Sequence, residues 1–229
     1  MQRTLITTAD GSHSIYVNDL DENYHSIHGA IQESKHVFIQ TGLKHKNSKS
    51  NATINILEIG FGTGLNAILT LLEAKKMNLS INYTSLEAFP LEKELVNVLN
   101  YISLISETEN IEEQELRGIF NQLHDCTWEK ENEIKNYFTL VKIKNKLQDV
   151  TFNSKFDLIY FDAFGPRVQP EMWTEALFMK IFAAMNEQGC LVTYCAKGEV
   201  KRTLKKVGFV VETLPGPPRK REMVRCTKL

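Results

Sequence analysis

The sequence predicts an α/β fold in which helices cover both faces of a mostly parallel β-sheet. Short apolar runs rich in β-branched residues alternate with longer stretches whose apolar residues recur at helical spacing. One run, 155–162, is mostly apolar, as a strand with helices on both sides must be. At 229 residues the chain is long enough for one large domain of this kind with a sizeable core.

The first part of the chain, 1–50, precedes the core domain, which spans 51–229. We interpret it as an N-terminal extension. Turn-forming residues followed by β-branched and aromatic ones predict a short strand at 15–17. A helix is expected over 24–38, and a polar loop at 47–51 then leads into the first core strand.

The core begins with a strand, a glycine cluster and a helix. Residues 54–59 have the strand pattern and 65–72 the helical one, and Gly60, Gly62 and Gly64 lie between them. Glycines at alternate positions let the backbone turn sharply and approach a ligand more closely than a Cβ would allow. The free N–H groups of the following helix point at that ligand. This unit predicts a nucleotide-binding loop.

The spacing of the glycines favours S-adenosylmethionine over a dinucleotide. A dinucleotide fingerprint needs its third glycine three positions after the second, where this chain has Leu65. Glu58 precedes the first glycine, and a carboxylate suits a ligand that carries an ammonium and a sulfonium. The stretch resembles motif I of the class I S-adenosylmethionine-dependent methyltransferases. A glycine-rich turn that binds nothing is the alternative.

A second acid supports a nucleotide ligand. Residues 81–87 form the next strand pattern, and Glu87 ends it 23 residues after Gly64. In nucleotide-binding α/β folds, an acid at the end of the second strand accepts hydrogen bonds from ribose hydroxyls. We therefore predict that Glu87 binds the ribose, with an ordinary solvated glutamate as the alternative.

The remaining elements follow in order. Pro90 is suited to the first turn of a helix, and an acid-rich stretch with apolar residues at helical spacing predicts a helical insertion at about 103–135. We then expect, in order, a strand at 138–143, a strand at 155–162, a helix from Pro170, a strand at 190–195 after a turn at Gly189, a helix at 199–206 and two closing strands at 208–214 and 222–226.

The strand at 155–162 ends in a candidate catalytic residue, Asp162, which Phe164 follows closely. Ligands of open parallel sheets lie beyond the carboxyl ends of the strands, where the strand order reverses. A carboxylate there suits an amine acceptor, because an alkylamine with a pKa near 10 must lose a proton before it attacks a methyl group. Asp162 can bind the amine and accept that proton while Phe164 excludes water. An aspartate that caps the next turn is the alternative.

Charge is distributed unevenly, although the formal net charge is only −1. Between Lys197 and Leu229, ten basic residues stand against three acidic ones. The loop at 215–221 combines three prolines with three basic residues, so it presents charge from a stiff backbone. This asymmetry predicts a surface that binds a polyanion, with a solvated basic surface as the alternative.

The compartment is predicted from what the sequence lacks. The first residues do not have the apolar core of a signal peptide, and no apolar run approaches the length that spans a bilayer. We therefore expect a cytoplasmic protein without a membrane partner. The spacing of Cys126, Cys190, Cys195 and Cys226 matches no zinc or redox motif, so we expect free thiols and no metal.

Several stretches together carry a resemblance. They are 57–66, 162–173, 193–198 and 216–223, with Glu33, Val37 and Phe38 in the extension. In these the chain resembles the MnmC/MnmD family, the methyltransferases of tRNA wobble-uridine modification. The resemblance implies a Rossmann-like class I methyltransferase with a mostly parallel, seven-stranded sheet. It also implies methylation of the 5-aminomethyl group of 2-thiouridine at the wobble position of tRNA.

The resemblance also assigns site residues and partners. Asp162 would be catalytic, and Glu58, Gly60, Phe61, Gly62, Gly64, Asn66 and Glu87 would bind S-adenosylmethionine. The substrate-binding residues would be Phe164, Pro166, Lys197, Lys220 and Arg221. Asn145 and Asp149 are both candidates for the adenine contact. Because the chain ends soon after the closing strand, we expect the stand-alone MnmD type without FAD, served by a separate oxidoreductase or wobble-modification enzyme that makes the aminomethyl substrate.

Two other kinds of function fit parts of the pattern. An aminopropyltransferase of the spermidine synthase kind, or a methyltransferase of small amines, also needs a glycine loop, a ribose-binding acid and an aspartate beside an amine. The basic C-terminal loop argues against the first. A non-catalytic RNA-binding module on the same fold is disfavoured, because Glu87 and Asp162 stand where chemistry would need them.

Overall fold

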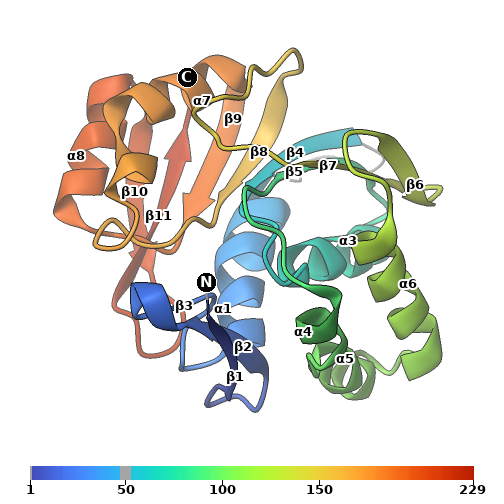
Figure 1. Ribbon diagram of the computed structural model, residues 1–229. Coiled ribbons are helices and arrows are strands. Elements are labelled where there is room, and N and C mark those ends of the chain that lie inside the picture. Colours follow the sequence, from blue (N-terminus) through green and yellow to red (C-terminus); the bar gives the residue numbers. More distant parts are fainter. Residues whose placement is uncertain (1, 47–52) are drawn as a thin grey trace.

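The computed structural model describes residues 2–46 and 53–229 and contains one large sheet (Figure 1). Its strands in chain order are β4 (Thr53–Ile59), β5 (Ser80–Leu86), β6 (Glu131–Lys135), β7 (Phe138–Ile143), β8 (Phe156–Phe161), β9 (Met185–Thr193), β10 (Val210–Pro215) and β11 (Glu222–Thr227). The eight strands lie in the order β10-β11-β9-β8-β4-β5-β7-β6. The pairs β4–β5, β4–β8, β5–β7 and β8–β9 are parallel, and the others are antiparallel. The predicted Rossmann-like α/β fold is confirmed, with one strand more than the seven expected.

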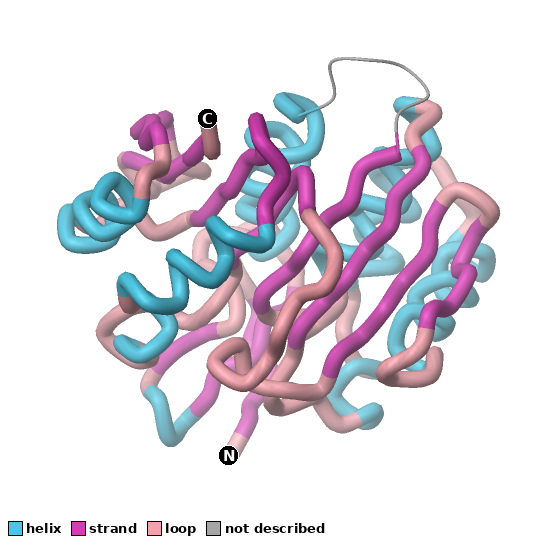
Figure 2. Tube along the Cα trace, turned by 90° about the horizontal axis from the view of Figure 1, so that it is seen from above, coloured by secondary structure: helices cyan, strands magenta, loops and turns pink. Residues whose placement is uncertain are grey.

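Helices cover both faces of this sheet, as Figure 2 shows from above. The principal ones are α3 (Leu65–Met77), α5 (Tyr101–Glu109), α6 (Glu113–Asp125), α7 (Glu175–Ala184) and α8 (Gly198–Val207). Alternate residues of a strand point to opposite faces of the sheet and so belong to two hydrophobic cores. Ile56 packs with α3, α5 and α6, whereas Leu57 packs with α7 and α8. The mostly apolar β8 is buried on both faces for this reason. In the described part of the chain, no helix is long and apolar enough to cross a membrane.

The N-terminal extension folds into a small antiparallel sheet and a helical segment. It comprises β1 (Arg3–Thr7), β2 (His13–Val17), η1 (Asn18–Leu20), β3 (Glu22–Asn23), α1 (Ala30–Ser34), the π-helical η2 (Lys35–Leu43) and α2 (Lys44–Lys46). The strand expected at 15–17 is confirmed within β2. The helix expected from residue 24 begins only at Ala30, where Ser12 Oγ, in the turn between β1 and β2, accepts a hydrogen bond from Ala30 N at 3.1 Å. The loop predicted at 47–51 lies outside the described residues.

The stretch after β5 departs most from prediction. The helix expected from Pro90 is the short α4 (Lys93–Asn97), which starts three residues later. The helical insertion is present as α5 and α6, but its expected end at residue 135 is wrong because Glu131–Lys135 is the edge strand β6. Only Ile134 of that strand is buried, which is why its composition did not indicate a strand.

The C-terminal half follows the predicted order of elements. Pro170 opens the short helix η3 (Pro170–Trp173), and Thr174 caps α7 by accepting a hydrogen bond from Leu177 N. Strand β9 starts at Met185, five residues before the expected start, and Gly189 lies inside it rather than at its beginning. An irregularity in the pairing of β8 with β9 absorbs these extra residues. The four cysteines, all within the described ranges, are free thiols.

Candidate active site

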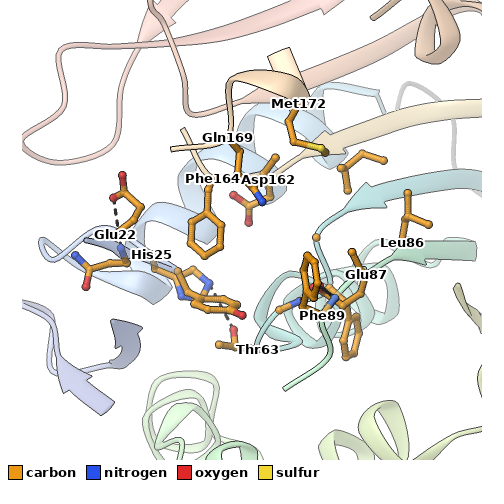
Figure 3. Close-up of a pocket in the computed structure, with 18 of the residues that line it drawn as sticks. Glu22, His25, Thr63, Leu86, Glu87, Phe89, Asp162, Phe164, Gln169 and Met172 are labelled. Atoms are coloured by element: carbon orange, nitrogen blue, oxygen red, sulfur yellow. Dashed lines mark hydrogen bonds between the residues drawn. The ribbon is translucent and has the colours of Figure 1, made fainter. Parts of the chain in front are cut away.

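A cavity of about 750 Å³ opens beyond the carboxyl ends of β4 and β8. From β4 the chain adds β5 and β7 on one side and then β8 and β9 on the other, so the strand order reverses between β4 and β8. In Figure 3, Asp162 and Phe164 project into the pocket from one side, and Glu87 and Phe89 lie across from them. The cavity therefore lies at the edge of the sheet where the sequence predicts the site.

The glycine loop forms the floor of one end of this cavity. Gly60, Gly62 and Gly64 have φ values of 96°, 49° and 73°, a conformation that L side chains rarely adopt. A Cβ on Gly60 would lie 2.9 Å from the carbonyl oxygen of Asp162. Gly60, Phe61 and Gly62 line the cavity, whereas Gly64 sits behind it at the start of α3. Gly64 therefore shapes the loop and does not face the cavity.

Glu87 lies on the wall beside this loop. Its Oε2 accepts a hydrogen bond from Gly62 N at 3.0 Å, and its Oε1 accepts one from Phe89 N at 2.8 Å. The carboxylate thus links the glycine loop to the segment after β5 while still lining the cavity. Asn145 and Asp149 line the same cavity, so both remain candidates for the adenine contact.

Glu58 does not face the cavity, contrary to its expected contact with the cofactor. Its side chain is fully buried in β4, where Oε2 accepts a hydrogen bond from Ser85 Oγ at 2.7 Å. The pKa of Glu58 is raised to about 8, chiefly by burial and in smaller part by the charge of Asp162, while the hydrogen bond from Ser85 acts to lower it. A carboxyl group that is largely neutral near pH 7 has no charge with which to attract an ammonium.

Asp162 is held in place by an amide. Asn66 Nδ2 donates to Asp162 Oδ2 at 2.9 Å, and Ser34 Oγ donates to Asn66 Oδ1, which fixes the orientation of the amide. Asn66 lines the cavity as expected of a cofactor contact, but its amide is engaged with Asp162. Burial raises the pKa of Asp162 to about 7, and the charge of Glu33 acts in the same direction. Near neutral pH this carboxyl group can therefore both hold and release a proton.

Three further side chains from distant segments meet at the other end of the cavity. Glu33 in α1 forms an ion pair with Lys220, which lies in the loop between β10 and β11. The Nζ atom of Lys220 also lies 4.7 Å from the centroid of the Tyr194 ring. All three line the cavity that contains Asp162. Glu33 and Tyr194 lie in stretches that carry the family resemblance, but the sequence indicates no role for them, because no local pattern connects them.

The residues expected to bind substrate are not all brought together. Phe164 lines the cavity, where its ring packs edge-on against Tyr24 with centroids 5.2 Å apart. Lys220 also lines it, but the ammonium is paired with Glu33 and is not free on the surface. Pro166, Lys197 and Arg221 are not among the lining residues, and Lys197 and Arg221 are exposed. Their contact with substrate stays a prediction.

The N-terminal extension supplies a wall that the sequence did not indicate. The Tyr24 ring lies so close to Gly62 that a Cβ there would be 3.1 Å from it. His25 Nε2 lies 3.5 Å from Thr63 Oγ1. Arg3 in β1 donates to the carbonyl oxygen of Phe89 at 2.9 Å, which ties the small sheet to the segment after β5. The extension is therefore part of the site.

These features fit S-adenosylmethionine. The backbone of the glycine loop is accessible from a cavity that is large enough for a nucleoside and an amino acid. The Glu87 carboxylate lies beside that backbone. Asp162 and Glu33 at the other end suit a group that carries positive charge. Within 2–46 and 53–229, no group of three or more His, Cys, Asp or Glu side chains could hold a metal ion.

Comparisons with known proteins identify the family of the chain. A family described as S-adenosyl-L-methionine-dependent methyltransferase matches residues 106–229. The tRNA 5-methylaminomethyl-2-thiouridine biosynthesis bifunctional protein MnmC of Leptospira borgpetersenii serovar Hardjo-bovis is 29% identical over 211 residues, covering 89% of this chain and 32% of its own length. The protein of the same name from Pseudoalteromonas atlantica is 31% identical and covers 90% of this chain and 31% of its own length. The chain thus spans about a third of these relatives.

Solved structures share the fold. The structure of MNMC2 from Aquifex aeolicus superposes with a TM-score of 0.78 at 24% identity, covering all of this chain and 70% of that one. Spermidine synthase from Thermotoga maritima gives a TM-score of 0.56 at 14% identity, again over all of this chain and over 72% of its own. At these identities both comparisons speak for the fold alone.

Proposed function

The chain belongs to the family of S-adenosyl-L-methionine-dependent methyltransferases, and on this premise we propose that it methylates the 5-aminomethyl group of 2-thiouridine at the tRNA wobble position. The product would be 5-methylaminomethyl-2-thiouridine, the nucleoside that appears in the names of the MnmC relatives. One observation supports this proposal above others. A single cavity joins the glycine loop to Asp162, whose pKa of about 7 suits proton transfer from an amine.

We propose that Gly60, Phe61 and Gly62 hold S-adenosylmethionine along the loop backbone and that Glu87 binds its ribose hydroxyls. When bound, this cofactor supplies a methyl group on a positively charged sulfur, which an amine can attack through its lone pair. The protein therefore has to present the acceptor amine without its extra proton.

Asp162 performs that step in this proposal. In its ionised form it accepts a proton from the substrate ammonium, and a base with a pKa near the operating pH serves this purpose best. Asn66 keeps the carboxyl group oriented through its 2.9 Å hydrogen bond. Phe164 and Tyr24 pack together over the cavity and exclude water, which would otherwise compete for Asp162.

The tRNA would be bound outside the cavity. Arg221 and Lys197 are exposed, and they lie in the basic C-terminal part of the chain, so they are suited to contact phosphates. The aminomethyl substrate would come from a separate oxidoreductase or wobble-modification enzyme, and such an enzyme would act in the cytoplasm. We expect no requirement for FAD or a metal ion.

The experiment that tests this function is methyl transfer from labelled S-adenosylmethionine to tRNA from cells that lack this gene. Nucleoside analysis should then find the label in 5-methylaminomethyl-2-thiouridine. Mixtures of free polyamines and other small amines serve as competing acceptors in a parallel reaction. Label in a small amine but not in tRNA would replace the proposed substrate with an amine metabolite.

A further inference from the structure

One end of the cavity already contains a primary ammonium, which belongs to the protein. Lys220 and Glu33 are 187 residues apart in the sequence, yet the Lys220 ammonium contacts the Glu33 carboxylate. The same ammonium lies 4.7 Å from the centroid of the Tyr194 ring. A carboxylate and an aromatic face are the two kinds of group that bind ammonium ions best in proteins. Both line the cavity that contains Asp162.

The two groups that receive this ammonium are fixed in place. The Glu33 side chain is only 9% exposed, and its Oε2 accepts a hydrogen bond from Ser26 N at 2.7 Å. The Tyr194 hydroxyl donates to the carbonyl oxygen of Ala163 at 2.8 Å, so the ring is anchored directly beside Asp162 in the chain. These contacts do not involve Lys220 and would remain without it.

Lys220, in contrast, reaches Glu33 and Tyr194 with a long side chain that is 29% exposed. It comes from the loop between β10 and β11, where its neighbours Arg219 and Arg221 are exposed. A lysine ammonium is a compact charge on a flexible stem, and it can leave one partner for another without any change in the rest of the fold. The receiving groups are thus rigid, and the cation that they receive is the movable part.

We propose that Glu33 and the face of Tyr194 form a subsite for the primary ammonium of the acceptor, and that the Lys220 ammonium occupies this subsite until substrate binds. This inference rests on the proposed function, because it names the part of the site that binds the acceptor amine. The incoming ammonium displaces that of Lys220, which then lies with Arg219 and Arg221 on the basic surface. Asp162 next to the subsite afterwards accepts the proton.

The location of the ion pair argues against a purely structural role. A buried ion pair is weak evidence for stability, because desolvation of both groups offsets much of their attraction. This pair is also accessible from the cavity rather than enclosed in either of the two cores. A substrate ammonium would find the same two partners at the same place.

Binding of the free nucleoside 5-aminomethyl-2-thiouridine tests the subsite without tRNA. Titration calorimetry with S-adenosylhomocysteine present would compare the wild type with Lys220→Met, which removes the charge but keeps the length of the side chain. Because the nucleoside no longer has to displace an ammonium, it should bind Lys220→Met about tenfold more tightly than the wild type. The matched control is Lys205→Met, an exposed lysine in α8, which should bind as the wild type does.

Two comparisons make the result specific. The nucleoside 5-hydroxymethyl-2-thiouridine has no ammonium, so Lys220→Met should not improve its binding. Glu33→Gln should weaken binding of the aminomethyl nucleoside, and adding Lys220→Met to it should restore little, since the carboxylate is the group that Lys220 blocks. Unchanged thermal unfolding of Lys220→Met, and wild-type binding by Lys220→Arg, establish that the site is intact.

Equal or weaker binding of the aminomethyl nucleoside by a folded Lys220→Met protein would overturn the inference. It would mean that Lys220 belongs to the binding site itself. The proposed function fails in a different way, when tRNA from cells lacking the gene receives no methyl group. Nucleoside binding and tRNA methylation are measured separately, so either result stands without the other.

Discussion

The two ends of the cavity are built by different means. At the glycine-loop end the backbone forms the surface: Gly60 and Gly62 have positive φ values, and Gly62 N donates to Glu87. At the acceptor end the surface consists of side chains: Glu33, Lys220 and Tyr194 converge from α1 and from two segments near the C-terminus. The first end depends on a short continuous stretch, and the second depends on the whole fold.

This difference predicts how each end responds to substitution. A change in a side chain at the acceptor end alters chemistry and leaves the glycine loop in place. A change in the loop backbone alters cofactor binding and also reaches Asp162, because Gly60 lies against the carbonyl oxygen of that residue. Substitutions at the two ends therefore test this asymmetry.

Asp162→Asn should reduce kcat/KM about 10³-fold, within the range that a general base contributes. The asparagine keeps the size of the side chain and an oxygen that can accept the hydrogen bond from Asn66, so cofactor affinity should stay within a few-fold. Single-turnover kinetics and calorimetry with S-adenosylhomocysteine measure the two quantities separately. An equal loss of both would show that Asp162 shapes the cofactor site and is not the base.

Gly60→Ala should lower cofactor affinity about tenfold to a hundredfold and should also destabilise the protein. The φ of 96° is unfavourable for alanine, and the new Cβ would lie 2.9 Å from a backbone oxygen that cannot move alone. The matched control is Gly118→Ala in α6, where no atom lies within 4 Å of the added Cβ. That change should leave cofactor binding unaltered and stabilise the protein by about 0.5–1 kcal/mol. If both substitutions bind cofactor as the wild type does, the loop backbone is not the contact surface.

The contrast between the two ends explains what the sequence could predict. The motifs indicated the MnmC/MnmD family and the methyltransferase fold, and both predictions are confirmed. The glycine loop and Asp162 were assigned from local spacing, because a strand that ends in a turn places the next residues at the same edge of the sheet. The subsite of Glu33 and Tyr194 could not be predicted, since only the folded chain brings α1 to the end of β9.

Glu58 shows a limit of the same kind. Its position before the glycines is a local fact, but the direction of its side chain depends on the pleat of β4 and on the neighbouring strand that provides Ser85. The edge strand β6 was missed because only one of its residues is buried. The wall made by Tyr24 was missed because the extension has no motif that relates it to the loop.

The pH dependence of single-turnover methyl transfer should follow Asp162. The pKa of this carboxyl group is about 7, so the rate should be roughly tenfold lower at pH 6 than on a plateau above about pH 8. Deprotonation of the amine in solution, with its pKa near 10, would instead give a rate that still rises beyond pH 8. A rate that rises without a plateau would assign the proton transfer to solvent and not to Asp162.

The smallest expected effect is on stability. Burial raises the pKa of Asp162 to about 7 and that of Glu58 to about 8, above the values of 3.8 and 4.5 that apply to the unfolded chain. Between these limits the folded protein binds more protons than the unfolded chain does, so the free energy of unfolding falls as pH rises. His25 and His124, whose pKa burial lowers to about 4 from 6.5, act in the opposite direction, mostly below about pH 6.5.

In the window from pH 6.5 to 8 the two buried carboxyl groups therefore outweigh the histidines. Across it the free energy of unfolding should fall by roughly 2 kcal/mol, as urea denaturation at each pH would measure. Asp162→Asn removes one titrating group and lessens the charge felt by Glu58, so the fall should shrink to about half. Glu107→Gln, an exposed control in α5, should leave it unchanged. If the free energy of unfolding falls by the same amount in Asp162→Asn, then ionisation of the buried Asp162 carboxyl group does not destabilise the folded protein. The two ends of the cavity would then differ only in whether backbone or side chains form their surface.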